Sequence, residues 1–213
     1  MFEINHVEYN GIITIDHLSI DEGSFTAIIG ESGGGKSTFL RMLNKMLSPS
    51  KGSILFKGAP LEEYDSVGLR RQVLYLKQKP YMFMGSVKDN LLIGLKYQHK
   101  EYPTDDMLLK MLERVHLAVS LHQDARTLSG GEAQRVALAR LLLLEGDVYL
   151  FDEPSSALDE KSEMKVLTSV FDWLKSKNKT LIMVTHSKQV ASTHTDRILR
   201  ISSGTIKEDP HEW

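Results

Sequence analysis

Cysteine and long hydrophobic runs are both missing from this sequence. None of the 213 residues is a cysteine, which excludes disulfides and thiolate metal sites. The longest aliphatic run, Leu141 to Leu144, is far shorter than the ~20 residues that a membrane-spanning helix needs. The first residues, Met1 to His6, are too polar for a secretion signal. We therefore expect a cytoplasmic chain, and any membrane-spanning part would belong to another polypeptide.

A large excess of charge of one sign is missing too. Acidic and basic residues number 28 and 26, the formal net charge is −2, and no long basic run occurs. Nucleic-acid binding needs a concentrated basic surface, so we expect no nucleic-acid partner. The eight histidines lack the spacing of zinc ligands. At 213 residues and 41% hydrophobic content, residues 1–213 are predicted to form a single domain with a full core.

The most recognisable motif present is Gly30–Thr38, GESGGGKST. It matches the phosphate-binding pattern of glycine, four residues, glycine, lysine and a hydroxyl residue, with a spare glycine at 34. A predicted strand at 25–29 precedes it, and apolar residues at helical spacing follow it. These apolar residues are Phe39, Leu40, Leu43, Met46 and Leu47. The strand, loop and helix context argues against a chance glycine-rich loop.

Such a loop binds the phosphates of a nucleotide. Its glycines let successive N–H groups point at phosphate oxygens, and the helix N-terminus adds about half a positive charge. Lys36 is expected to reach the β and γ phosphates, and Ser37 is expected to ligate Mg²⁺. The predicted nucleotide-binding residues of the loop are Gly30, Ser32, Gly33, Gly34, Gly35, Lys36, Ser37 and Thr38.

A second motif, Val148–Pro154, places two carboxylates at the end of a predicted buried strand. Asp152 is expected to hold Mg²⁺, and Glu153 is expected to polarise the attacking water. Alone, the segment would equally fit an apolar strand that ends in a solvated acidic turn. The phosphate loop upstream favours a hydrolytic site.

Hydrolysis also needs positive charge on the far side of the γ-phosphate, and no single arginine is recognisable as an arginine finger. The segment Ser129–Glu132 instead predicts a helix start, with Ser129 as N-cap and Glu132 three residues later. A serine hydroxyl, glycine amides and a helix dipole can bind an anion in place of arginine. An ordinary capping box explains the same residues.

The longer string Leu128–Arg135, LSGGEAQR, resembles the signature of the ATP-binding cassette (ABC) family. The signature and both nucleotide motifs occur in the family's order, and the resemblance covers nearly the whole chain. It implies a homodimer in the ATP-bound state, in which the signature of one protomer closes over ATP held by the other. The signature residues so implicated are Ser129, Gly130, Gly131 and Glu132, the last being a common variant of glutamine.

Four further positions take roles from the same resemblance. Gln78 would contact Mg²⁺ or water, His186 the γ-phosphate, Asp159 the second site across the dimer, and Tyr9 the adenine. Plainer explanations are a surface glutamine, a structural histidine and a helix N-terminal turn. Tyr9 also fits the tip of a hairpin with an Asn-Gly turn. The implied catalytic residues are Glu153, His186, Gln78 and Lys36, and the implied Mg²⁺ ligands are Ser37, Gln78 and Asp152.

The alternation of short strands and helices predicts an α/β fold with a P-loop NTPase core. An N-terminal antiparallel β layer is expected from strands near 2–8, 12–20 and 53–57. A parallel sheet is expected from strands near 25–29, 73–77, 148–151 and 180–184.

The middle of the chain is predicted to be helical. Thr104 reads as the N-cap of an amphipathic helix. Its apolar stripe consists of Leu108, Leu109, Met111, Leu112 and Val115. The resemblance implies that residues of about 84–145 form an inserted helical subdomain. Before it, Tyr81–Met84 is unusually apolar for a loop and would help to receive a helix of a membrane subunit, although it could equally be core.

The resemblance implies the ATP-hydrolysing subunit of an ABC transporter, with ATP and Mg²⁺ as cofactors and a separate multi-span membrane subunit as partner. Asp124–Thr127 is unlike the loop found there in exporters, and little chain follows Ile206, so a compact stand-alone subunit is expected. Similar small subunits serve metal (iron) efflux, which we favour, or phosphate or amino-acid uptake. The alternatives are a soluble cassette ATPase in DNA repair or translation, and a nucleotide-binding regulator without turnover.

Overall fold

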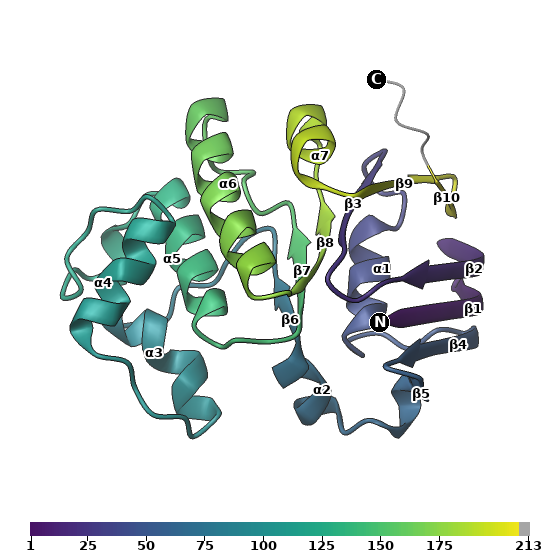
Figure 1. The fold of residues 1–213 in the computed structure, drawn as a ribbon, viewed down its shortest axis with the longest axis horizontal. Helices are drawn as coiled ribbons and strands as arrows, with labels where there is room; N and C mark the ends of the chain where they lie inside the picture. The colour runs from purple at the N-terminus through teal and green to yellow at the C-terminus, as the bar shows by residue number, and fades with distance from the viewer. Residues whose placement is uncertain (209–213) are drawn as a thin grey trace. The chain divides into compact units, whose positions relative to one another are not determined.

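The structure, a computed structural model, describes residues 1–208 (Figure 1). The chain divides into two compact units. One contains Met1–Tyr75, Gly146–Glu153 and Leu174–Trp213, and the other contains Leu76–Glu145 and Pro154–Trp173. Within residues 1–208, no helix is both long and apolar enough to cross a membrane.

A ten-stranded sheet organises the first unit within residues 1–208. The strands are β1 (Phe2–Tyr9), β2 (Ile13–Ile20), β3 (Phe25–Gly30), β4 (Lys51–Phe56), β5 (Ala59–Pro60), β6 (Val73–Leu76), β7 (Val148–Asp152), β8 (Thr180–Val184), β9 (Arg197–Ser202) and β10 (Thr205–Glu208). Their order is β5-β4-β1-β2-β10-β9-β3-β8-β7-β6. The predicted α/β class is confirmed, and the seven predicted strands correspond to β1, β2, β3, β4, β6, β7 and β8. β1 pairs antiparallel with β2 and β4, β8 pairs in parallel with β3 and β7, and β6 lies next to β7.

The predicted antiparallel and parallel strands belong to one continuous sheet. Two strands that the sequence analysis did not predict, β9 and β10, join them. β9 pairs in parallel with β3 and antiparallel with β10. β10 meets β2 through the single parallel pair Thr205↔Thr14. β3 and β9, like β2 and β10, are far apart in the chain, so no local pattern indicates that they pair.

The turn between β1 and β2 has the predicted Asn-Gly conformation. Asn10 and Gly11 have φ of 46° and 68°, as a type I′ turn requires. The N–H of Ile12 donates to the carbonyl of Tyr9 at 2.8 Å and closes the turn. The side chain of Tyr9 is half-buried and packs against the edge of the core.

Helix α1 (Lys36–Leu43) packs against the strands β3, β7 and β8. Its apolar face enters a core shared by antiparallel and parallel strands, with Phe39 and Leu43 beside Ile15 and Val184. The helix ends at Leu43, so the prediction that its periodicity continues through Met46 and Leu47 was wrong. Lys45 adopts φ of 56°, which turns the chain away from the helix and leaves Met46 exposed.

Further elements complete the first unit. Helix α7 (Lys188–His194) contributes Ala191 to a second apolar cluster with Ala27, Ile29 and Ile198. Because β3 and β9 supply these partners, both faces of the parallel strands are covered, as their continuous burial requires. Between β5 and β6 lie η1 (Leu61–Glu63) and α2 (Ser66–Gln72).

The second unit is helical. It contains α3 (Val87–Tyr97), α4 (Asp105–Arg114), η2 (Ala125–Thr127), α5 (Gly130–Leu142) and most of α6 (Glu160–Ser176). Helix α5 packs against both α3 and α4, and the three lie together in Figure 1. The Nζ of Lys88 on α3 lies 2.6 Å from a carboxylate oxygen of Asp105 on α4.

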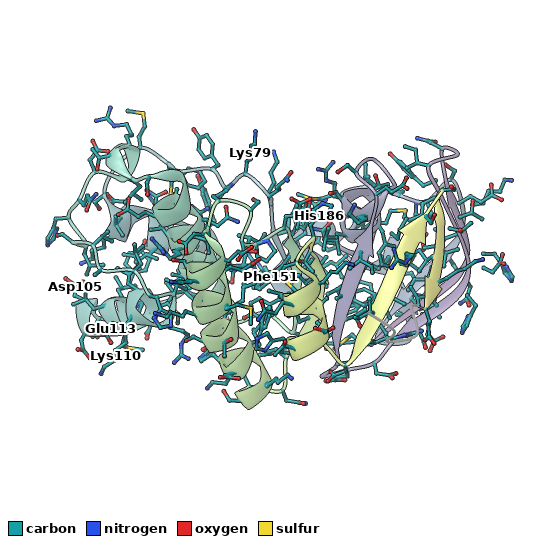
Figure 2. The ribbon with its side chains drawn as sticks, turned by 90° about the horizontal axis from the view of Figure 1, so that it is seen from above. Lys79, Asp105, Lys110, Glu113, Phe151 and His186 are labelled. Atoms are coloured by element: carbon teal, nitrogen blue, oxygen red, sulfur yellow. The ribbon has the colours of Figure 1, made fainter. Side chains whose placement is uncertain are left out.

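The amphipathic helix predicted after Thr104 is confirmed. The Thr104 hydroxyl accepts from the N–H of Met107 as an N-cap. Leu108, Leu112 and Val115 are buried, whereas Leu109 is exposed, so the predicted stripe was one residue too wide. Figure 2 labels three charged residues of this helix, Asp105, Lys110 and Glu113.

The apolar segment Tyr81–Met84 is an ordered surface loop. Tyr81 is 68% and Met84 is 83% exposed, so the alternative that the segment is core was wrong for these two. Phe83 is half-buried and packs edge-on against Tyr81, with ring centroids 5.0 Å apart. The buried Asn90 holds the loop by accepting from the Phe83 N–H at 2.8 Å and donating to its carbonyl at 2.9 Å.

Candidate functional site

Gly30 ends β3 and opens the phosphate loop. Its φ is 138°, in a region that glycine alone adopts readily. A Cβ built at Gly30 would lie 2.1 Å from the carbonyl oxygen of Ile201 on β9. Only glycine therefore lets the loop leave the sheet so close to the neighbouring strand.

This close approach predicts a large and local effect on stability. Gly30→Ala is expected to destabilise the fold by about 2 kcal/mol or more, because the backbone must move away from β9 or remain strained. Gly58→Ala is the matched control, since Gly58 also has positive φ but no atom lies within 4 Å of its added Cβ. Urea unfolding of both variants measures the difference. Equal losses in both variants would contradict a role for the Ile201 contact.

Lys36 begins α1, and its side chain curls back over the phosphate loop. It is 5% exposed, and its Nζ donates to the carbonyl oxygens of Gly30 at 2.8 Å and Glu31 at 2.6 Å. Burial lowers the pKa of Lys36, and the nearby carboxylates of Glu153 and Asp152 act in the opposite direction. A partly desolvated ammonium at this loop is suited to bind a phosphate oxygen.

Asp152 ends β7 and is buried beside the start of α1. The hydroxyl of Ser37 donates to its Oδ1 at 2.9 Å. The hydroxyl of Tyr75, at the end of β6, donates to its Oδ2 at 2.7 Å. Both oxygens of the carboxylate are therefore held by hydroxyl groups from neighbouring elements.

Glu153 and His186 form a pair at the ends of β7 and β8. His186 Nε2 lies 3.1 Å from Glu153 Oε1, and Figure 2 labels this histidine. Glu153 has φ of 50°, and its N–H donates to the carbonyl of Val184 at 3.0 Å. This turn directs the chain out of the sheet directly after Asp152. The loop lysine, two acidic residues and a histidine thus belong to one unit, around the carboxyl ends of adjacent strands.

Two contacts of this site went unnoticed in the sequence, namely those of Tyr75 and Arg41. Burial, followed by the hydrogen bond to Asp152, raises the pKa of Tyr75 to about 12, so its hydroxyl is a donor at neutral pH. Arg41 on α1 donates from Nε to that hydroxyl oxygen at 3.4 Å. The sequence signal for this contact is a tyrosine near the end of a predicted strand. It could be used only if that strand were known to lie next to the acidic strand in the sheet.

A magnesium ion fits the oxygen donors at Ser37 and Asp152. Within residues 1–208, no three His, Cys, Asp or Glu side chains are grouped so as to hold a metal ion by themselves. Magnesium is usually bound by one or two carboxylates together with substrate phosphates, and it prefers oxygen ligands. One carboxylate and one hydroxyl next to a phosphate loop match that requirement.

The second unit contains the predicted capping box. Glu132 accepts from the N–H of Ser129 at 2.8 Å and from its hydroxyl at 2.7 Å, and the Ser129 Oγ accepts from the Glu132 N–H at 3.4 Å. The first of these bonds, from the Ser129 backbone, is the main cause that lowers the pKa of Glu132. The helix start predicted at Ser129–Glu132 is confirmed, with Ser129 exposed at the N-terminus of α5.

The start of α5 lies against the segment that contains Asp159. A Cβ on Gly131 would come within 3.0 Å of the Ala157 carbonyl oxygen, so a side chain there would push the two apart. The buried Gln134 donates to the Pro154 carbonyl at 2.8 Å. The Asp159 carboxylate accepts from the Ser162 N–H at 3.1 Å, as the helix-start interpretation requires.

The remaining predicted residues are distributed over both units. Gly130 is exposed beside Ala157 in the second unit, and Gln78 is exposed two residues after the end of β6. Tyr9 lies at the hairpin of the first unit. The other phosphate-loop residues, Ser32, Gly33, Gly34, Gly35 and Thr38, lie between β3 and α1 or in the first turn of α1.

Comparisons with known proteins agree with this arrangement. A family model described as ABC transporter matches residues 14–156. The Lactococcin-A transport/processing ATP-binding protein LcnC of Lactococcus lactis subsp. lactis is 36% identical over 202 residues, which cover 90% of this chain and 27% of that protein. The ABC transporter I family member 17 of Arabidopsis thaliana is 36% identical over 197 residues, covering 92% of this chain and 73% of that protein. This chain therefore spans only about a quarter of the length of LcnC.

Two solved structures have the same fold. The ATP-binding cassette MJ0796, in a dimeric post-hydrolysis state bound to ADP and Pi, has a TM-score of 0.87 at 24% identity and is covered completely. A bacterial Atm1-family ABC exporter with ATP bound has a TM-score of 0.85 at 24% identity, with 99% of this chain and 38% of that chain covered.

Proposed function

Because the chain belongs to the ABC transporter family, as a cassette ATPase, we propose that it powers transport through a separate membrane-spanning subunit. The observation that best supports catalysis is the convergence of Lys36, Asp152 and the Glu153–His186 pair in one unit. These groups differ in charge and exposure, which suits them to different tasks in ATP hydrolysis, namely phosphate binding, metal binding and activation of water. The second unit would be the helical subdomain, with the signature at the start of α5.

In the proposed reaction, water attacks the γ-phosphorus of ATP. Glu153 accepts the proton of that water as its oxygen bonds to phosphorus and the bond to the ADP oxygen breaks. His186, 3.1 Å from Glu153, orients the carboxylate and contacts the γ-phosphate. Lys36 and the amides of the phosphate loop neutralise the phosphate oxygens. Ser37 and Asp152 would hold Mg²⁺, which supplies further charge neutralisation when bound, and Gln78 would contact the same ion or the water.

The far side of the nucleotide would be completed by a second copy of the chain. Ser129 is exposed at the N-terminus of a 13-residue helix, α5, where N–H groups and the helix dipole favour an anion. In the proposed dimer, Ser129, Gly130 and Gly131 of one copy contact ATP bound to the other copy. Asp159, next to the signature in the same unit, would link the two sites, and Tyr9 would stack on adenine.

The names of the relatives do not support the preference for metal or iron efflux. The names of LcnC and of the ComA protein of Streptococcus pneumoniae describe transport and processing, and none of the cited names refers to iron. The preference for iron therefore has no support. The same transport names disfavour the alternative of a switch in DNA repair or translation.

Copurification tests the transport proposal. The Glu153→Gln variant would be purified with ATP from detergent-solubilised cells of the native organism, and the proteins that accompany it would be identified by mass spectrometry. Recovery of a multi-span membrane protein, absent from a parallel purification with Lys36→Met, is expected. Recovery of ribosomal, nucleic-acid or other soluble material alone would contradict transport and leave the ATPase assignment standing.

The exposed loop Tyr81–Met84 is the proposed contact with the membrane subunit. Phe83 lies 5.4 Å from the Arg140 guanidinium, measured to the ring centroid, so Phe83→Asp would also disturb the packing of the second unit. Met84 is 83% exposed and is the cleaner position to change. A methionine and an aromatic ring on a loop held by Asn90 suit an adaptable apolar contact.

Met84→Asp is expected to lower recovery of the membrane subunit by roughly 10-fold, since a charge at an apolar contact must be desolvated. Basal ATP hydrolysis should stay within about twofold of wild type, because a surface change removes no contact of the site. Met107→Asp, on an exposed residue of α4, is the matched control. If Met84→Asp and Met107→Asp behave alike, the loop is not the contact.

A further inference from the structure

Asp152 is held by an arrangement that the motifs alone do not account for. One oxygen accepts from Ser37, whose position belongs to the phosphate loop. The other accepts from Tyr75, which lies outside the phosphate loop, the acidic strand and the signature. The Tyr75 bond is the shorter of the two, at 2.7 Å against 2.9 Å. The tyrosine therefore contributes a strong and separate restraint on the carboxylate.

We propose that Tyr75 is a positioning residue for Mg²⁺ binding, a role that rests on the proposed ATPase function of the same site. A carboxylate can rotate about its Cβ–Cγ bond, and one hydrogen bond restrains that rotation incompletely. Ser37 is itself an expected Mg²⁺ ligand, so its hydroxyl is not available solely as a hydrogen-bond donor to Asp152. Tyr75 holds Oδ2 from β6, next to β7 in the sheet order, and so determines the orientation of Oδ1.

Arg41 donates to the Tyr75 hydroxyl oxygen and so leaves the hydroxyl proton for Asp152. Its Nε donates to the Tyr75 hydroxyl oxygen at 3.4 Å, while the hydroxyl proton points to Asp152. The chain of donors runs from Arg41 through Tyr75 to the carboxylate, and all three residues belong to the first unit. A ligand-orienting partner of this kind typically changes metal affinity by 10–100-fold, as an order of magnitude.

The test is Tyr75→Phe, which removes the hydroxyl and keeps the ring. Mn²⁺ replaces Mg²⁺ as a paramagnetic probe, and electron paramagnetic resonance measures free Mn²⁺ in the presence of a non-hydrolysable ATP analogue. The dissociation constant for Mn²⁺ is expected to rise roughly 10-fold. Binding of a fluorescent ATP analogue without metal should change by less than about twofold, because the Tyr75 hydroxyl is hydrogen-bonded to Asp152 and Arg41 rather than to the phosphate loop.

Tyr64→Phe is the matched control. The Tyr64 hydroxyl also makes a 2.7 Å hydrogen bond, but it donates to the Phe56 carbonyl in the antiparallel part of the sheet. Its removal should leave the Mn²⁺ dissociation constant unchanged. Equal effects of the two variants, or an unchanged constant in Tyr75→Phe, would overturn the proposal. So would an equally large loss of metal-free nucleotide binding.

The wild-type protein distinguishes failure of the proposed function from failure of the role of Tyr75. If the wild-type protein bound no Mn²⁺ with the ATP analogue, the proposed function would fail before Tyr75 was tested. If Tyr75→Phe did not fold, as judged by its thermal unfolding, Arg41→Gln would test the same chain of donors. We expect a rise of about threefold in the Mn²⁺ dissociation constant for Arg41→Gln, and no rise would overturn the proposal.

Discussion

Glu153→Gln is expected to reduce the rate of ATP hydrolysis by roughly 10²- to 10⁴-fold. The glutamine amide has the size of the carboxylate and can still contact His186, which lies 3.1 Å from Oε1 of Glu153 in the wild-type protein. The amide cannot accept a proton from water. ATP binding should persist, because Lys36, Ser37 and Asp152 are unchanged. Phosphate release measures the rate, and gel filtration with ATP measures the dimer that should accumulate.

The control for this result is Glu62→Gln, on an exposed glutamate of η1. It removes one carboxylate of the first unit without touching the site and should hydrolyse ATP at the wild-type rate. Normal phosphate release by Glu153→Gln would show that Glu153 is not the base. Slow phosphate release by Glu153→Gln without an ATP-dependent dimer would support Glu153 as the base but contradict the proposed dimer.

Lys36→Met is expected to weaken ATP binding and to lower hydrolysis by roughly 10²-fold or more, the scale of losing one preorganised charged donor. Methionine has similar length, so the loss isolates the charge. Burial lowers the pKa of Lys36, which means that the folded protein disfavours the ammonium relative to water. Its removal should therefore not lower the melting temperature through loss of charge.

Fluorescence of a labelled ATP analogue and phosphate release measure the two effects of Lys36→Met. Lys51→Met is the control, since the Lys51 side chain is 71% exposed and forms a surface ion pair with Glu8, away from the site. An unchanged affinity for ATP in Lys36→Met would contradict the role of Lys36. A large fall in melting temperature would assign the loss to folding.

Local signals explain why much of the fold was predictable. The Ser129–Glu132 capping box and the Thr104 N-cap join groups three residues apart. The Asn10–Gly11 turn depends on the φ values of two neighbouring residues. Such interactions are encoded within one turn of chain. The apolar strands were predictable for the same reason, because continuous burial needs a continuous apolar run.

The sequence alone determined the motifs and therefore the family, the nucleotide loop and the identity of Asp152 and Glu153 as candidates. Only the tertiary structure decided what surrounds them. Ser37 and Tyr75 lie 115 and 77 positions from Asp152 in the chain. Strand β9 pairs with β3 through residues such as Thr26 and Arg197, and the hydrogen-bonded Phe25 and Asp196 beside them are 171 positions apart. Strand order sets such contacts, and a chain pattern with a period of two residues carries no information on which strands become neighbours.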